Sequence, residues 1–190
     1  MTVKTIVDIK ADAQNPRSSE GDFVRLPSGR LLFAYSRFHG GSHDYSPSNI
    51  AGLFSDDNGE TFTATPQTLV NASEHGTENV MSVSLISLQN GEAGLFYLVK
   101  RPDGTTDYVM RRTADGQTFS EAKSCIPATS LRGYYVVNNA RKGDTVLMHM
   151  QWNGFNKSTV KKIKSGLKKK GIALCKNTGK VSAKPSKVKC

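Results

Sequence analysis

Polar and charged side chains gather at the approach to three apolar hairpins. Such side chains donate and accept hydrogen bonds, so together they could bind a polar ligand. The candidates are Arg17, Glu20 and Asp22, then Glu78, Asn79 and Ser82, then Tyr134, Asn138, Asn139 and Arg141. Three histidines, His39, His43 and His75, lie in polar or glycine-rich segments, and nothing in their spacing predicts a metal site.

The hairpins that must position these candidates recur along the chain. Each joins two apolar-rich runs through a turn that contains a glycine, which is a typical hairpin signal. The paired runs are 23–26 with 30–35, 80–88 with 92–99, and 134–137 with 145–150. Their turn glycines, Gly29, Gly91 and Gly143, are 62 and 52 residues apart. A further alternating segment, residues 5–9, could form an edge or closing strand.

A second pattern follows the first hairpin, in residues 55–62, S-D-D-N-G-E-T-F. Asp and Asn side chains bond to nearby backbone N–H groups in tight turns, and glycine supplies the positive φ that such a turn needs. We expect a loop held by its own side chains, with a strand before it and another opening at Thr61 and Phe62.

These eight residues resemble the Asp box of the sialidase-type β-propellers, S-x-D-x-G-x-T-[FW]. The matching positions are Ser55, Asp57, Gly59, Thr61 and Phe62. In that family the box staples two outer strands on the rim, remote from the active site, so the resemblance implies a structural role. A second copy at residues 113–119 keeps Gly116, Thr118 and Phe119, while Arg112 and Ala114 stand where Ser and Asp are expected.

The repeated hairpins predict an all-β fold. A period of about 50–60 residues, with several short strands per period, is typical of propeller blades. The resemblance implies six four-stranded blades, of which this chain would supply about two and a half. A partial propeller leaves a strand edge uncovered.

The resemblance also implies roles for single residues. Sialidases bind the carboxylate of sialic acid with three arginines, because a guanidinium matches a carboxylate through two parallel bonds. Arg17 stands two residues from the place of the first arginine, whose R-I-P motif is absent here, and Arg37 matches an arginine that follows the first hairpin. Asp44, in His43-Asp44, loosely matches the acid/base aspartate. The family's tyrosine and glutamate pair belongs to later blades.

The charge is unevenly distributed along the chain. Net charge is +10 over 190 residues, yet residues 1–151 contain all 16 acidic and only 14 basic residues. Residues 152–190 contain 12 lysines and no acidic residue. We therefore expect a sialidase-like propeller fragment at 1–151 and a lysine-rich tail at 152–190.

Three explanations of the tail stay open. It could be an arm that binds nucleic acid or another anionic surface, or a solvated disordered segment. It could also be out-of-frame translation after a frameshift, which the abrupt change in composition favours. The absence of arginine, and of aromatic residues beyond Phe155, speaks against a nucleic-acid arm.

No cofactor or metal is expected. Cys125, Cys175 and Cys190 are odd in number and fit neither a disulfide framework nor a zinc site. The N-terminus has no long apolar core, and no run approaches the roughly 20 apolar residues of a membrane helix. The default expectation is a cytoplasmic protein without membrane contact.

The favoured hypothesis is a fragment of a sialidase-like exo-glycosidase that removes terminal sialic acid or a related sugar from glycans and is inactive alone. A non-catalytic carbohydrate-binding or structural propeller is the alternative. A basic-tail nucleic-acid binder is the second alternative and the least favoured. The expected partner is a glycan, and an open propeller edge could also support self-association.

Overall fold

The computed structural model describes residues 4–129, 137–142 and 145–150, together with Ser158, Lys161, Lys162 and Ser165, which are helical. The chain forms two compact units, Met1–Ser130 and Leu131–Cys190. Each unit is described by itself.

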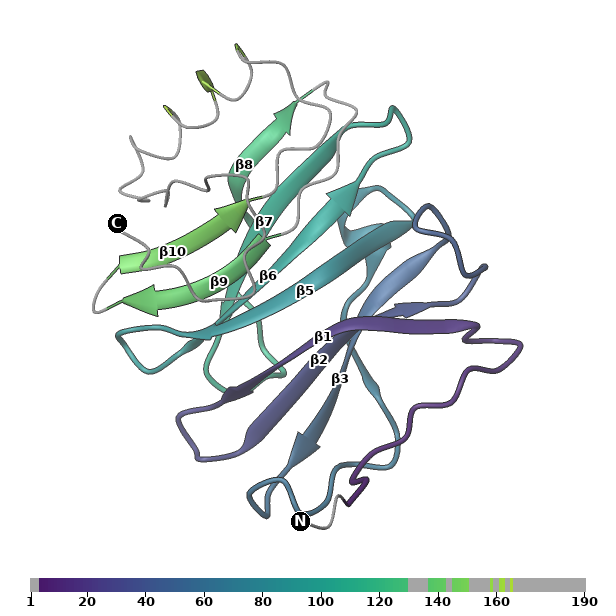
Figure 1. Cartoon of the computed structure of the whole chain (residues 1–190), viewed down its shortest axis with the longest axis vertical. Coiled ribbons are helices and arrows are strands. Elements are labelled where there is room, and N and C mark those ends of the chain that lie inside the picture. The colour runs from purple at the N-terminus through teal and green to yellow at the C-terminus, as the bar shows by residue number, and fades with distance from the viewer. Residues whose placement is uncertain are drawn as a thin grey trace, which may run out of the picture. The chain divides into compact units, whose positions relative to one another are not determined.

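The first unit is built from two antiparallel groups of four strands (Figure 1). We call them the first meander and the second meander. The first meander comprises β1 (Arg17–Arg25), β2 (Leu31–Phe38), β3 (Ser48–Ser55) and β4 (Gln67–Val70). The second comprises β5 (Asn79–Ser87), β6 (Ala93–Lys100), β7 (Thr106–Thr113) and β8 (Lys123–Thr129). A short 3-10 helix, η1 (Ala72–His75), lies between them.

All neighbouring strands within a meander pair antiparallel, in chain order. The two meanders join where β3 and β5 run parallel, through the pair Ser48 and Asn79. This makes one eight-stranded sheet whose order is β1-β2-β3-β5-β6-β7-β8, with β4 also paired to β3. The first unit is therefore all-β, as the hairpin pattern predicts.

The turns of the first hairpin in each meander have the same construction. In the first, the Leu26 N–H bonds to the Arg30 carbonyl, and the Gly29 N–H bonds back to Leu26. In the second, Leu88, Glu92 and Gly91 take the same places. Both turns need a residue in the left-handed region, and the glycines provide it with φ of 89° and 85°.

The main core lies between the two meanders. Successive side chains of a strand point to opposite faces of the sheet, so each strand contributes alternate residues to this core. On β2, Leu32 and Ala34 belong to the cluster shared with Leu95 and Val99 of β6. Burial of each large side chain in this cluster stabilises the unit by roughly 1.5–3 kcal/mol. The opposite face of β2 carries a smaller cluster around Tyr35.

Two predictions about single elements are wrong. The strand after loop 55–62 begins at Gln67 rather than at Thr61 and Phe62. Residues 5–9 form no strand; instead Ile9 packs against the smaller cluster on the face of β2. Side-chain contact with a sheet face thus replaces the expected strand pairing.

The second unit contains the third predicted hairpin. Strand β9 (Val137–Lys142) pairs antiparallel with β10 (Thr145–Met150), and Thr145 stands opposite Lys142. Tyr134 and most of residues 152–190 lie outside the described residues. The boundary between propeller fragment and tail therefore stays a prediction.

Candidate functional site

Loop 55–62 is held by its own side chains. Ser55 Oγ donates to Asp57 Oδ1 over 2.7 Å and accepts from the Gly59 N–H over 2.8 Å. Asp57 also accepts from the N–H of Thr61, at 2.9 Å, and from its hydroxyl. These bonds favour the charged form and lower the pKa of Asp57 to about 2, with the Thr61 hydroxyl contributing most.

Loop 113–119 repeats this bonding with one residue fewer. Thr113 Oγ1 donates to Asp115 Oδ1 over 3.1 Å and accepts from the Gly116 N–H over 2.8 Å. The same carboxylate oxygen accepts from the N–H groups of Thr118 and Gln117, which help to lower the pKa of Asp115 to about 2.

The expected alignment of this second loop is wrong by one residue. Thr113 and Asp115 take the places that the sequence pattern assigned to Arg112 and Ala114. The residue between Asp57 and Gly59, which is Asn58 in the first loop, has no counterpart, because Asp115 directly precedes Gly116. The second loop therefore keeps both the hydroxyl and the carboxylate that hold the first.

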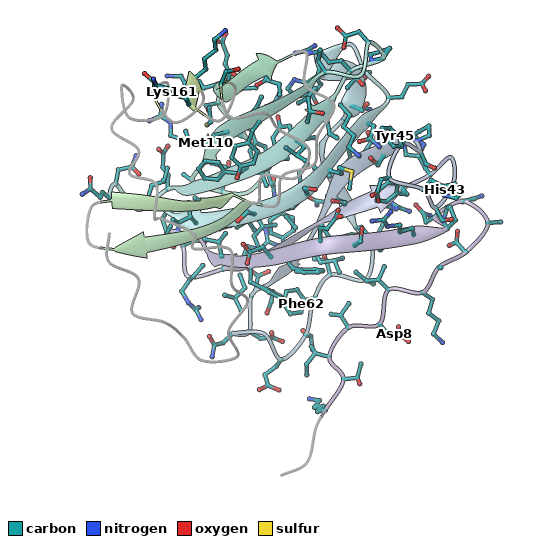
Figure 2. All side chains as sticks on the ribbon, turned by 45° about the horizontal axis from the view of Figure 1, so that its top comes forward. Asp8, His43, Tyr45, Phe62, Met110 and Lys161 are labelled. Carbon is teal, nitrogen blue, oxygen red and sulfur yellow. The ribbon has the colours of Figure 1, made fainter. Side chains whose placement is uncertain are left out.

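Both loops connect the third and fourth strands of their meanders, so they follow β3 and β7. The loop that carries Asp44 precedes β3 and therefore lies at the opposite end of that strand. Figure 2 shows His43 and Tyr45 together on that loop, away from Phe62. We call the end of the sheet that carries residues 39–47 the Asp44 end.

Sheet pairing brings four strand termini to the Asp44 end. Arg17, which begins β1, pairs with Phe38, which ends β2. Asn79, which begins β5, pairs with Lys100, which ends β6. Because Asn79 also stands beside Ser48 at the junction of the meanders, charged and amide groups from both meanders meet there.

Arg17 and Asp44 form the centre of this cluster. Arg17 Nη1 lies 2.6 Å from Asp44 Oδ1, and Arg17 Nη2 lies 3.4 Å from Glu20 Oε1. The guanidinium stands over the ring of Phe38, 4.4 Å from its centroid, which fixes its plane. Hydrogen bonding and charge from Arg17 lower the pKa of Asp44, whose side chain is 44% exposed.

Two residues of the second meander hold the backbone of the Asp44 loop. Lys100 Nζ donates to the Asp44 carbonyl over 2.6 Å and stands 4.7 Å from the centroid of the Tyr45 ring. Asn79 Nδ2 donates to the carbonyls of Ser46 and Asp44. Burial lowers the pKa of Lys100, opposed by the charges of Asp44 and Glu20. Lys100 is a functional candidate that the sequence did not reveal.

Asp22 faces the second meander. Its Oδ2 accepts from the N–H of Leu85 over 2.8 Å and from Ser84 Oγ over 3.3 Å. Asp22 thus joins β1 to β5, and its role in sugar binding stays a prediction. Glu20 combines both roles, because Oε2 accepts from the Ser82 N–H while Oε1 faces Arg17.

The remaining candidates lie apart or are not placed. Arg37 donates through Nε to Asn15 Oδ1, and it stands beside Ser18 in the sheet register. Glu78 contributes its backbone carbonyl to the Ser48 N–H. The candidates on β9, Asn138, Asn139 and Arg141, belong to the second unit, and the structure does not place them relative to Arg17.

The chemistry available at the Asp44 end is charge recognition. Arg17 and Lys100 supply two cations, and Asp44 and Glu20 supply two carboxylates within the same cluster. Residues 4–129 contain no group of three or more His, Cys, Asp or Glu side chains arranged to hold a metal ion. No helix found in the described part of the chain has the length and hydropathy to cross a membrane.

The sequence matches no protein-family model and no curated protein. Among solved structures, a Hadza microbial sialidase is similar with a TM-score of 0.50 and 18% identity, over 58% of this chain and 26% of the sialidase. A protein of unknown function from Dyadobacter fermentans is similar with a TM-score of 0.50 and 15% identity, over 76% of this chain and 53% of that protein. The chain thus spans between about a quarter and a half of these structures. At such identities the likeness concerns the fold alone, and the chain has a sialidase-like fold.

Proposed function

We propose that this chain forms one part of the sugar site of a sialidase-like exo-glycosidase. The observation that carries the proposal is the 2.6 Å contact between Arg17 and Asp44, which come from segments 27 residues apart. The fold makes this contact at the end of the sheet opposite loops 55–62 and 113–119. An arginine for the carboxylate of sialic acid and an aspartate for proton transfer would then lie side by side.

In this proposal the two meanders are the first two blades of a six-bladed propeller, and β9 and β10 begin a third. Loops 55–62 and 113–119 are its Asp boxes. The Hadza sialidase supports this interpretation through its fold, of which this chain covers 26%. The remaining arginines, the nucleophilic tyrosine and its glutamate would come from blades that these residues do not supply.

The Arg17–Asp44 pair suggests how binding could prepare the acid. In the free protein Arg17 lowers the pKa of Asp44, which keeps that carboxyl ionised. An incoming sugar carboxylate would compete for the same guanidinium, since two parallel N–H bonds suit a carboxylate. Loss of the Arg17 bond would raise the pKa of Asp44 and allow it to carry the proton that a leaving oxygen needs.

The lowered pKa of Asp44 equally favours a second candidate, a carbohydrate-binding propeller without hydrolysis. A general acid works best with a pKa near the working pH, and the free protein shifts Asp44 in the other direction. In this alternative Arg17 binds the sugar carboxylate and Asp44 only orients Arg17.

Binding of N-acetylneuraminic acid, measured by saturation-transfer NMR, tests the proposal. The methyl ester of the same sugar is the ligand control, because it lacks the charge that Arg17 would recognise. We expect Arg17→Gln to weaken binding of the acid by about tenfold or more, the usual effect of losing a charged hydrogen-bond partner. Arg25→Gln, on the same strand but bonded to Gly29 and Asn58, is the matched control. Equal binding of acid and ester by the wild type would contradict the proposal.

Asp44→Asn separates the two candidates. In a full-length enzyme it should abolish turnover of a fluorogenic sialoside while leaving binding measurable. A non-catalytic propeller shows no turnover even without the substitution, so Asp44→Asn changes only its affinity for the sugar.

A further inference from the structure

Asp44 and Tyr45 stand at the centre of a β-turn. The Ser46 N–H donates to the His43 carbonyl over 2.9 Å, and the His43 N–H donates to Ser46 Oγ over 3.1 Å. These two bonds close the turn on itself. The residues at 40–41, just before it, are both glycine, whose backbone has wide conformational freedom. The turn therefore fixes its own shape, whereas its place on the sheet depends on contacts with other strands.

Two neighbouring side chains of the second meander attach this turn to the sheet. Asn79 and Lys100 stand opposite each other in the register of β5 with β6. The Asp44 carbonyl accepts from Lys100 Nζ over 2.6 Å and from Asn79 Nδ2 over 3.2 Å. Asn79 Nδ2 also donates to the Ser46 carbonyl. The carbonyls of the residues on both sides of Tyr45 are thereby held.

The amide of Asn79 is committed to this contact. Asn79 is 5% exposed, and its Oδ1 is buried without a hydrogen-bond partner. A buried oxygen without a partner is unfavourable. The opposite orientation of the amide would bring that oxygen against the carbonyl oxygens of Asp44 and Ser46, so Asn79 can hold the turn in one orientation only.

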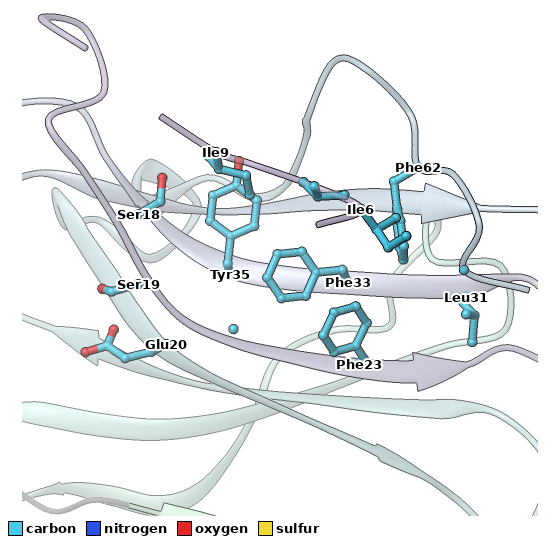
Figure 3. A pocket seen from close by; sticks show the side chains of 13 residues that line it. Ile6, Ile9, Ser18, Ser19, Glu20, Phe23, Leu31, Phe33, Tyr35 and Phe62 are labelled. Carbon is cyan, nitrogen blue, oxygen red and sulfur yellow. The ribbon is translucent and has the colours of Figure 1, made fainter. Parts of the chain in front are cut away.

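Lys100 supplies charge as well as a hydrogen bond. Asn79 shows that a neutral amide can hold the same carbonyl, while burial of the Lys100 ammonium is unfavourable and lowers its pKa. The negative charges of Asp44 and Glu20 oppose that shift. Figure 3 shows the Glu20 carboxylate at the edge of an apolar pocket, pointing away from the ring of Phe33. The ammonium therefore belongs to the charged cluster at the Asp44 end.

Two cations act on different parts of Asp44. Arg17 Nη1 bonds the carboxylate at 2.6 Å, and Lys100 Nζ bonds the backbone carbonyl at 2.6 Å. The Arg17 bond contributes most to lowering the pKa of Asp44, against the effect of burial, and the charges of Lys100 and His43 add to it. We propose that Lys100 is a positioning residue for Asp44, which holds the backbone of the turn on the second meander and keeps a positive charge beside the carboxylate.

This role rests on the sugar site proposed above and adds a second cation to it. When a sugar carboxylate takes Arg17, Lys100 remains beside Asp44 and limits the rise of its pKa. The attached turn also keeps the Asp44 carboxyl in one place, so that little reorganisation precedes proton transfer. Lys100 thus acts on the proton of Asp44 without touching the sugar.

The pKa of Asp44, followed in the 190-residue chain by carbon-13 NMR of its side-chain carboxyl, tests the proposal. Lys100→Met removes both the charge and the bond. We therefore expect the pKa of Asp44 to rise toward its ordinary value, and the Ser46 N–H to exchange faster because the turn is no longer anchored. Lys100→Gln keeps a donor without the charge, so it should raise the pKa and keep part of the protection. Lys100→Arg keeps the charge and should leave the pKa close to that of the wild type.

Arg101→Met is the matched control. Arg101 follows Lys100 and likewise donates to a backbone carbonyl, that of His75, over 3.3 Å, so its loss removes the same charge and the same kind of bond. The pKa of Asp44 should then stay unchanged. An Asp44 pKa that is equal in wild type and Lys100→Met, or in Lys100→Gln if the first variant does not fold by far-UV circular dichroism, would overturn the proposal. An equal rise in Arg101→Met would assign the effect to net charge and overturn it as well.

Binding of N-acetylneuraminic acid separates this proposal from the sugar site itself. We expect Lys100→Met to bind the acid at least about twofold more weakly than the wild type, since residues that do not touch a ligand can change its affinity by such factors. Equal binding of acid and methyl ester by the wild type would overturn the sugar site, and the pKa of Asp44 would still decide whether Lys100 positions it. Selective binding of the acid that Lys100→Met leaves unchanged, together with an unchanged pKa, would overturn only the role of Lys100.

Discussion

Replacement of Ser55 by alanine should destabilise the first unit through loop 55–62. The Ser55 side chain is 2% exposed and makes two bonds, one to Asp57 and one from the Gly59 N–H. Without the hydroxyl, the Gly59 N–H loses its acceptor and Asp57 loses a donor. Leaving such a group unpaired costs about 1–3 kcal/mol. Gly59 is partly exposed, so water can replace part of the bond and the lower half of that range applies.

The sequence offers its own control for this substitution. Loop 113–119 has Thr113 where the first loop has Ser55, with the same two bonds. Ser55→Thr should therefore keep most of the stability that Ser55→Ala loses. Ser28→Ala, in an exposed turn, should change the free energy of unfolding by less than about 0.5 kcal/mol.

Two measurements report this effect. Urea unfolding followed by far-UV circular dichroism gives the free energy, and the expected loss corresponds to a melting temperature lower by about 2–8 °C for a chain of this size. Amide hydrogen exchange gives the local effect, since the N–H groups of Gly59 and Thr61 should lose protection together. If Ser55→Ala unfolds like the wild type and Gly59 stays protected, the Ser55 hydroxyl does not hold the loop and its two bonds add nothing to stability.

Three further predictions concern other parts of the chain. Gly116→Ala should destabilise the first unit by at least about 1–2 kcal/mol in urea unfolding, because residue 116 has a φ of 73° and a Cβ there would stand 2.7 Å from Phe54. Gly104→Ala is its control, since φ is also positive there but the space is open; equal losses would mean that the contact with Phe54 is unimportant. Burial holds the pKa of His75 below its ordinary value of 6.5, where His75 Nε2 meets the Tyr97 hydroxyl at 2.8 Å and the charged neighbours are Glu74, Arg101, Asp107 and Arg111. His75 therefore binds a proton more weakly in the folded protein than in the unfolded chain. The stability that this difference contributes is present above about pH 6.5 and is lost as the pH falls through the lower pKa of folded His75. His75→Gln should flatten the decline in stability between about pH 7 and pH 5, and an unchanged slope would assign that decline to other groups. Finally, the 190-residue chain should not hydrolyse a fluorogenic sialoside, because that reaction needs an acid and a nucleophile on opposite sides of the sugar and Asp44 supplies at most the first; turnover above that of Asp44→Asn would refute this division of roles.

Features that depend on neighbours in sequence could be predicted. The two hairpin turns are closed by Gly29 and Gly91 within five residues, and the positive φ of each glycine is a local requirement. The bonds within loops 55–62 and 113–119 likewise join residues two to four positions apart. The repeat of about 60 residues follows from these local signals, and with it the all-β fold.

Features that depend on strand pairing could not be predicted in the same way. Lys100 contacts the Asp44 carbonyl across 56 residues, and Asn79 contacts it across 35. A lysine at the end of a buried strand carries no local sign of such a role. Only the register of β5 with β6, and the parallel meeting of β3 with β5, brings these groups to Asp44. The second loop was recognised from Gly116, Thr118 and Phe119, but its hydroxyl and carboxylate were misassigned, because one missing residue moves Thr113 and Asp115 out of the pattern.

The first strands of the two meanders, β1 and β5, show how residues of the Asp44 end also take part in the packing of the sheet. Glu20 on β1 and Ser82 on β5 are 62 residues apart, like Gly29 and Gly91, and both have a positive φ, of 49° and 60°. Each lies in a β-bulge, and the Ser82 N–H bonds to Glu20 Oε2. Positive φ in a residue other than glycine costs about 1–2 kcal/mol, so packing must hold both bulges in place. The same bulge turns the other oxygen of Glu20 toward Arg17. We therefore expect a group that displaces Asp44 from Arg17 to change, through Glu20, the contact of Glu20 with the Ser82 N–H that joins β1 to β5.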